Sequence, residues 1–453
     1  MHIFPDLVRL EKKYPNQLVV IGVHTPKFDS EKKTENIRKA VLRYEIAHPV
    51  INDVDRKIWA AYGIKAWPTV VLIDPEGYIF GMRNDERPFQ ILDNAISQLI
   101  RFHKKKRTLN EKPLRFQLAR DQEPGDTPLY FPGKVLADGM GNRLFIADST
   151  HHRIVITDLD GKKIAIAGTG AEGRNDGPFE KASFRDPQGL ALRGDTLYVA
   201  DRKNHLIRAL DLKARTVKTI AGTGQQGKDV GKGGAALRVG LNSPWDLLLN
   251  ENTLFIAMAG HHQIWTLDLK ADKLAPWAGN AFENIMDGPR PLCSFAQPSG
   301  LATDGTGLFI ADSESSSIRG VKLDGGSLVQ TLVGPLGRGL FEFGDVDGEG
   351  LEVRLQHPIG IVCVDKRLYV ADTYNNKIKE IVPLDRSCTT FVGGKSDDNK
   401  EPLFNEPAGI SYANGKLYVA DTNAHRIRVV DMKTKAVTTL KLEGVEPPKK
   451  DEK

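Results

Sequence analysis

One fifteen-residue pattern recurs six times in this chain of 453 residues, and it limits the possible folds more than any other feature. The clearest copy is LYVADRKNHLIRALD, residues 197–211. The other copies begin at Leu144, Leu254, Leu308, Leu368 and Leu417. Each copy follows a leading proline, and these prolines are Pro132, Pro187, Pro244, Pro298, Pro358 and Pro407. They lie 49 to 60 residues apart, a period that is typical of a repeat architecture.

Each repeat contains four short apolar runs separated by turn residues. In the second repeat the runs are residues 189–192, 197–201, 206–211 and 219–222. Alternating apolar and polar residues and β-branched runs predict strands. Four antiparallel strands repeated six times predict an all-β, six-bladed β-propeller over residues 131–442, whose closed ring leaves only short sheet edges exposed.

The turn between the second and third strands carries the same residues in most repeats. In the second repeat they are Asp201, Asn204, His205 and Ile207. Together with an upstream Pro-x-Gly, this pattern resembles the NHL repeat. We expect the Asp or Asn to bond to the turn backbone and the His to satisfy a neighbouring turn. The His position holds Ser316 and Asn376 in two repeats, which favours this structural role over a catalytic or metal-binding role.

Residues 1–107 predict a different unit, with helices and strands in alternation. We expect helices over residues 7–14, 31–48, 55–62 and 89–99, and strands over 18–23, 50–52, 70–73 and 78–81. The run 18–23 is continuously apolar, as in a strand that is buried on both faces of an α/β sheet. The last two strands form a hairpin around Asp74-Pro75-Glu76-Gly77, which is a turn sequence.

This order of elements resembles the second part of a thioredoxin-like domain of the redoxin type. The residues that carry the resemblance are 62–64, then Trp67, Pro68 and Thr69, then the strand at 70–73. In that family the proline before the strand is cis and faces the active-site cysteines. The resemblance implies that Trp67, Pro68 and Thr69 form a substrate-binding loop that offers its backbone to a peptide. The alternative is that Pro68 merely starts an edge strand.

No cysteine pair accompanies this loop. Cys293, Cys363 and Cys388 all lie in the propeller region, and they form neither a CxxC motif nor a zinc pattern. In the thioredoxin-like family a proline follows the CxxC motif in the next helix, and Pro5 matches it. The resemblance therefore predicts a cysteine pair just before Met1, an N-terminally truncated sequence, and a domain without redox activity as written. The alternative is that Pro5 occupies the first turn of a helix, where proline is favourable.

A thioredoxin-like domain followed by six NHL repeats resembles the NHL repeat-containing protein 2 family. The resemblance implies a thiol–disulfide redox-related function with the propeller as a protein-binding module, and it leaves open whether the chain is an enzyme. The alternative is a non-catalytic interaction scaffold. A metal-dependent hydrolase or lyase is disfavoured because the innermost strands nearly lack acidic residues. We expect no cofactor and no metal site, and a protein or peptide as the partner of one propeller face. The sequence leaves the oligomeric state open.

Composition is ordinary for a globular protein, with 40% hydrophobic and 27% charged residues. A net charge of +5 is too small to favour nucleic-acid binding. We expect no membrane segment and a cytoplasmic location. Residues 108–130 are expected to form a linker, with a possible strand at 114–118, and residues 443–453 a disordered tail. The cationic run 103–107 suits a helix end.

Two groups of propeller residues are candidates for binding. The second residue after the leading proline is Gly in four repeats but Lys134 and Asp246 in the first and third. We expect both side chains to project toward one mouth of the central channel and to bind a polar partner group. The third repeat replaces the usual Asp by Met258 and concentrates three tryptophans, Trp245, Trp265 and Trp277. These aromatic residues predict either compensatory core packing or an exposed recognition surface.

Overall fold

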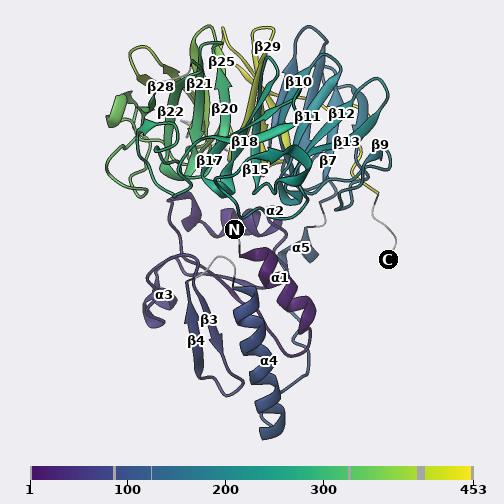
Figure 1. Cartoon of the computed structure of the whole chain (residues 1–453), viewed down its shortest axis with the longest axis vertical. Coiled ribbons are helices and arrows are strands. Elements are labelled where there is room, and N and C mark those ends of the chain that lie inside the picture. Colours follow the sequence, from purple (N-terminus) through teal and green to yellow (C-terminus); the bar gives the residue numbers. More distant parts are fainter. Residues whose placement is uncertain (1–2, 85–87, 124, 325–327, 395–402, 450–453) are drawn as a thin grey trace. The chain divides into compact units, whose positions relative to one another are not determined.

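The chain divides into two compact units, Met1–Pro124 and Gly125–Lys453 (Figure 1). The computed structural model describes residues 3–84, 88–123, 125–324, 328–394 and 403–449. The division falls inside the segment 108–130 that the sequence predicts to be a linker. Among the described residues, no helix combines the length and the apolar character needed to cross a bilayer.

The first unit alternates helices with short strands. Its elements are α1 (Phe4–Lys13), β1 (Gly22–His24), η1 (Ser30–Lys32), α2 (Thr34–Arg43), β2 (Val50–Asn52), α3 (Lys57–Ala61), β3 (Val70–Ile73), β4 (Ile79–Arg83), α4 (Phe89–Lys106) and α5 (Ala119–Gln122). Strand β1 pairs with β2 in parallel, and β3 pairs with β4 in antiparallel orientation. Leu10 of α1 packs with Leu92 and Ile96 of α4, and these side chains form the core of the unit.

Three local expectations for this unit need correction. Strand β1 has three residues, and Ile21 and Val23 are exposed, so the prediction of a strand at 18–23 that is buried on both faces was wrong. The helix predicted over 31–48 ends at Arg43, because Glu45 has a φ of 57° that a helix does not allow. No strand forms at 114–118. The cationic run 103–107 ends α4, where the helix dipole favours positive charge.

The second unit is a six-bladed propeller, as predicted. Each blade is one antiparallel sheet whose four main strands are consecutive in the sequence. Blade one contains β5 (Val135–Asp138), β6 (Arg143–Asp148), β7 (Arg153–Thr157) and β8 (Lys163–Ala167). Blade two contains β10 (Pro187–Arg193), β11 (Thr196–Asp201), β12 (Leu206–Asp211) and β13 (Thr216–Ala221). Blade three contains β15 (Pro244–Asn250), β16 (Thr253–Met258), β17 (Gln263–Asp268) and β18 (Lys273–Ala278).

The remaining three blades repeat this arrangement. Blade four contains β20 (Pro298–Thr303), β21 (Gly307–Asp312), β22 (Ser317–Lys322) and β23 (Leu328–Val333). Blade five contains β25 (Pro358–Val364), β26 (Arg367–Asp372), β27 (Lys377–Val382) and β28 (Ser387–Gly393). Blade six contains β29 (Pro407–Ala413), β30 (Lys416–Asp421), β31 (Arg426–Asp431) and β32 (Val437–Thr439). In blades two to five the loop from the preceding blade adds a two-residue strand to the outer edge: β9 (Gly177–Pro178), β14 (Gly234–Ala235), β19 (Gly288–Pro289) and β24 (Gly348–Glu349).

Each blade is apolar on both faces because it lies between two others. Phe145 and Ala147 of blade one, for example, pack with Leu190 and Val199 of blade two. The second strand of each blade is therefore almost completely buried, as in the pattern of β11.

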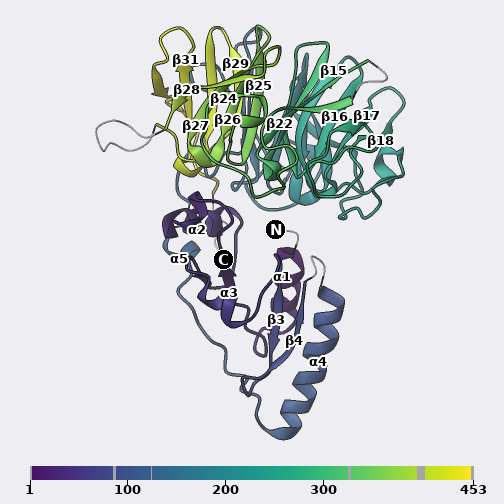
Figure 2. The same cartoon turned by 90° about the vertical axis from the view of Figure 1, so that its left-hand side faces the viewer.

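The ring is closed by side-chain and tail contacts between blades six and one. Figure 2 labels β31 of blade six, and the tail that follows this blade pairs with blade one through a bridge between Lys162 and Glu443. The hydroxyl of Thr422 donates to the carbonyl of Pro132 at 2.8 Å. The N–H of Lys163 donates to the carbonyl of Glu443 at 3.0 Å, and Val445 is buried. The prediction of a disordered tail was therefore wrong for residues 443–449, while residues 450–453 lie outside the described residues.

Candidate functional site

The loop Trp67–Thr69 lies directly before β3 in the thioredoxin-like unit. The peptide bond between Trp67 and Pro68 is cis, as the resemblance implies. The hydroxyl of Thr69 lies 2.6 Å from the carbonyl oxygen of Ala66 and 2.7 Å from Oδ1 of Asn84. These contacts hold both ends of the loop in place.

Trp67 presents an aromatic side chain to solvent, with 44% of its surface exposed. Its ring centroid lies 4.6 Å from that of Trp59 on α3. Buried Asp53 fixes the start of this helix, since its carboxylate accepts the N–H groups of Ile58 and Trp59 at 2.9 and 2.8 Å. Burial alone would raise the pKa of Asp53, but these hydrogen bonds lower it overall. The two tryptophans therefore form a partly exposed aromatic surface next to Pro68, and the hydrogen bonds of Asp53 fix the helix that carries Trp59.

The three cysteines are far less reactive than ordinary thiols. Cys293 and Cys388 are fully buried, and burial raises the pKa of their thiols to about 11 and about 12. Burial also raises the pKa of half-buried Cys363. Since the thiolate is the nucleophile, burial disfavours thiol–disulfide exchange at all three side chains near neutral pH.

One cluster of possible metal ligands occurs in the first unit. The side chains of Asp74, Glu76 and His103 approach within 4.8 Å of one another. His103 is buried, with Nδ1 2.7 Å from the hydroxyl of Thr108, and Lys106 lies 2.6 Å from Glu76. The groups therefore join the β3–β4 turn to the end of α4.

In blades two and four of the propeller, the repeated Asp and the Arg seven positions later form a buried ion pair. Asp201 accepts the N–H of Arg185 at 2.8 Å on Oδ1, and it accepts Nη1 of Arg208 at 2.8 Å on Oδ2. Both side chains of the pair are completely buried. Burial raises the pKa of Asp201 to about 6, against the opposing effect of the Arg208 charge.

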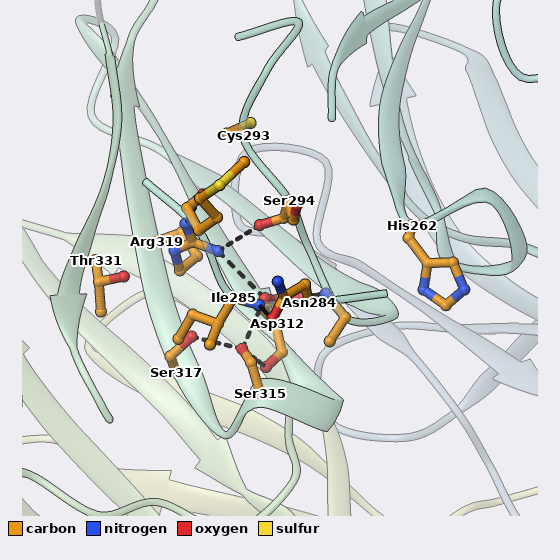
Figure 3. A network of polar contacts seen from close by, with 12 residues as sticks. His262, Asn284, Ile285, Cys293, Ser294, Asp312, Ser315, Ser317, Arg319 and Thr331 are labelled. Atoms are coloured by element: carbon orange, nitrogen blue, oxygen red, sulfur yellow. Dashed lines mark hydrogen bonds and ion pairs between the residues drawn. The ribbon is translucent and has the colours of Figure 1, made fainter. Parts of the chain in front are cut away.

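The same network stands in blade four (Figure 3). Nη1 of Arg319 donates to the carbonyl of Ser294 at 2.9 Å and lies 3.4 Å from Asp312, while Ser315 donates to Asp312 at 2.6 Å. The other end of the guanidinium donates to Asp287 in the inter-blade loop at 2.8 Å.

The repeated His position clamps each blade to the next. In every blade this residue has a positive φ, and its side chain accepts the N–H of the residue before the next leading proline. The pairs are His152 with Asp186, His205 with Ser243, His262 with Gln297, Ser316 with His357, Asn376 with Glu406 and His425 with Phe131, at 2.7 to 3.3 Å. The predicted structural role is confirmed, and the sixth pair joins the last blade to the first.

Lys134 and Asp246 do point toward the ring axis, but they bind each other. Nζ of Lys134 lies 3.0 Å from Oδ2 of Asp246 and donates to the carbonyls of Ser299 and Ile359 at 2.7 and 3.0 Å. Asp246 also accepts the N–H of Leu301 at 3.0 Å. Because both side chains are buried, their expected position at an open mouth needs correction. Burial lowers the pKa of Lys134 and raises that of Asp246, while their mutual attraction opposes both shifts.

Blade three replaces the ion pair by two apolar groups. Trp265 occupies the position of Arg208 and is fully buried, with Nε1 donating to Gln263 at 2.9 Å. Sδ of Met258 accepts the N–H of Asn242 at 3.3 Å, the bond that an Asp makes in the other blades. Compensatory packing therefore explains this pair, and the expectation of Trp265 as a recognition residue was wrong. Trp245 is half-buried, with the guanidinium of Arg202 4.4 Å from its ring centroid.

Sequence reasoning missed the residues that bind the basic side chains from outside the blade. Asp176, Asp287 and Asp347 each contact the buried Arg or Lys and a threonine of the fourth strand. The available signal is the Asp-Gly pair that recurs in three inter-blade loops, at residues 176–177, 287–288 and 347–348.

Comparison with known proteins agrees with both units. A thioredoxin-like family model matches residues 1–79, and the NHL repeat model matches residues 184–210 and 404–430. The chain is 41% identical over 431 residues to NHL repeat-containing protein 2 of Bos taurus, covering 88% of this chain and 59% of that protein. The chain is therefore homologous to NHL repeat-containing protein 2 over most of its own length.

A second relative and a solved structure show how far the likeness extends. Protein SUPPRESSOR OF QUENCHING 1, chloroplastic, of Arabidopsis thaliana is 43% identical over 87% of this chain and 39% of its own length. The chain thus spans about 40 to 60% of the length of these two relatives. The structure of streptogramin B lyase aligns with a TM-score of 0.44 and 12% identity over 70% of this chain and 86% of that chain, which is too distant to argue from.

Proposed function

We propose that this chain supplies the docking surfaces of a thiol–disulfide redox protein. The Trp67–Thr69 loop binds an extended segment of the substrate, and the propeller binds a protein partner. The observation that carries this proposal is the exposed Trp67, whose ring centroid lies 4.6 Å from that of Trp59 directly before β3, in a chain homologous to NHL repeat-containing protein 2. An extended segment on such a loop gains backbone hydrogen bonds and covers the aromatic surface.

The chain's own cysteines take no part in the proposed exchange. Cys293 and Cys388 are buried, Cys363 is half-buried, and the pKa of each thiol is raised, so the reacting thiolate comes from another segment or molecule. The same observation favours the second candidate, a non-catalytic interaction scaffold. A cytoplasmic location belongs to this proposal as well.

Binding of a labelled ten-residue peptide with one central cysteine tests the proposal. We expect Trp67→Ala in the full chain to weaken binding at least tenfold, measured by fluorescence anisotropy. Trp277→Ala, which removes a half-buried tryptophan of the propeller, is the matched control and should leave binding unchanged. A peptide with an S-methylated cysteine that binds equally well would favour the scaffold, and full binding by the Trp67 variant would exclude the loop.

A further inference from the structure

The loop between blades three and four presents three large apolar side chains to solvent. Phe282 is 74% exposed, Leu292 is 60% exposed and Met286 is 41% exposed. Exposed apolar residues are ordinary when scattered singly, but several on one short loop indicate a contact surface.

These side chains stand on a rigid frame. Nδ2 of Asn280 donates to the carbonyl of Leu292 at 3.1 Å, and its Oδ1 accepts the N–H of Phe282 at 3.0 Å. The carbonyl of Met286 accepts the N–H of Ser294 and Nη2 of buried Arg319. The buried Arg319 network in Figure 3 therefore fixes the backbone of the loop, and a partner would bind without first ordering it.

Blade two shows that the frame does not need apolar residues at these positions. Its loop has the same bridge between Glu172 and Phe184 that joins Glu283 to Phe295 in blade four. Its buried Arg208 makes the same contacts as Arg319. At the three equivalent positions it carries Ala171, Asn175 and Lys181. Folding therefore does not require Phe282, Met286 and Leu292.

The loop that enters blade five also presents exposed apolar side chains. It presents Phe341, Val346 and Leu351, which are 65, 48 and 41% exposed. The N–H of Gly334, at the end of β23, donates to the carbonyl of Gly350 at 3.1 Å, so this loop is joined to blade four. Arg354 also holds it, since Nη1 donates to the carbonyl of Leu351 at 2.8 Å.

This second loop adds negative charge beside the apolar groups. Glu349 and Glu352 are exposed, and within the part of the chain that the structure describes their carboxylates make no hydrogen bond or ion pair. In blade two the position of Glu352 holds Lys181. We call the six apolar residues of the two loops, with Glu349 and Glu352, the blade four–five surface.

We propose that the blade four–five surface docks a basic amphipathic protein segment, an inference that rests on the proposed protein-binding role of the propeller. Apolar side chains of the segment cover Phe282, Met286 and Leu292, while its Lys and Arg residues meet Glu349 and Glu352. Large apolar anchors supply most of the affinity of such interfaces, and complementary charge adds specificity and speed of association. Methionine in particular adapts to differently shaped partners.

The test uses the full chain and two labelled peptides of equal length. One alternates Leu or Phe with Lys, and the other replaces Lys by Glu. We expect the basic peptide to bind and the acidic peptide to bind at least tenfold more weakly. The triple variant F282A/M286N/L292K, which installs the blade two residues, should weaken binding of the basic peptide at least tenfold. Lys181→Ala in blade two is the control and should change nothing.

A second variant tests the contribution of the Glu349 and Glu352 charges to binding. E349Q/E352Q should weaken binding and flatten its dependence on salt concentration. Full binding by the triple variant would overturn this surface and leave the propeller a protein-binding module. If neither peptide binds, the result would count against this surface and against the proposed protein-binding role of the propeller. A triple variant that changes the sedimentation of the chain alone would assign the surface to a second copy and contradict the proposal.

Discussion

The propeller and the thioredoxin-like unit differ in how completely their strands are paired. Each blade has four main strands whose buried second strand is paired on both sides. In the smaller unit, the described strands form two separate two-stranded sheets, and Ile79 and Phe80 of β4 are more than half exposed. Two-stranded sheets are marginal without further packing. We therefore expect the ring to be the more stable of the two units, and the smaller unit keeps exposed apolar surface on β4.

Within the ring, the blades can be compared at one buried pair of positions, which holds charged side chains in some blades and apolar side chains in another. Blades two and four bury an Asp–Arg pair, and blade three buries Met258 with Trp265. The blades share their strand register, so the fold requires a satisfied group there and does not require charge. An intact buried ion pair often adds little net stability, whereas breaking one is costly.

The largest expected effect comes from breaking the ion pair of blade two. Arg208→Ala should lower the free energy of unfolding by about 3 to 5 kcal/mol, because it leaves the Asp201 carboxylate buried and unpaired. Asp201→Met combined with Arg208→Met, an apolar pair like that of blade three, should cost less than the single change. Denaturant unfolding of the propeller measures both. Arg174→Ala on an exposed loop is the control and should stay within about 0.5 kcal/mol.

Removing the hydrogen bond between His425 and Phe131, which joins blade six to blade one, should lower the free energy of unfolding by a smaller amount. His425→Ala removes the acceptor of the Phe131 N–H and leaves that donor without its side-chain partner, which costs about 1 to 3 kcal/mol. His425→Asn should recover most of the loss, because Asn376 makes the same contact between blades five and six. Equal unfolding midpoints for the alanine variant and the unchanged chain would refute the clamp.

Asp372, the repeated Asp of blade five, should make the free energy of unfolding fall as the pH rises. Burial raises the pKa of Asp372 to about 7, and hydrogen bonds from Asn375 and Gln356 oppose the shift. The unfolded chain releases this proton near pH 4 while the folded chain keeps it, so this group lowers stability as pH rises from about 4 to about 7. Asp372→Asn should flatten that part of the stability profile, measured as unfolding free energy against pH. An unchanged slope would contradict the assignment.

The smallest stability effect is expected at the exposed loop of the other unit. Trp67→Ala should change the free energy of unfolding by no more than about 0.5 kcal/mol, since its side chain is 44% exposed. Trp265→Ala should cost about 3 to 5 kcal/mol because that ring is fully buried. Thermal unfolding of the two variants compares a solvent-exposed tryptophan with a core tryptophan directly. Similar losses of stability in the two variants would contradict the exposed position of Trp67.

The sequence predicted the features that repeat or depend on neighbours in the chain. The six blades and the hairpin at 70–83 follow from local pattern, because their turns and strand pairings are close in sequence, and the structural role of the His position follows from its repetition. It failed where distant partners decide the outcome. Lys134 and Asp246 are 112 residues apart and bind each other, which no local pattern reveals. The charged segment 443–449 resembles a disordered tail, yet the edge of blade one orders it. Strand β1 was overestimated because apolar composition does not tell which neighbours cover it.

We propose that this chain contributes docking surfaces and no reactive thiolate. A disulfide-reductase assay with the full chain, a dithiol reductant and insulin as substrate tests it most directly. We predict turnover no faster than the reductant alone, because Cys293, Cys363 and Cys388 have raised pKa values, and a triple cysteine-to-serine variant should behave identically. Robust turnover by this chain that is lost in the cysteine-free variant would contradict the account.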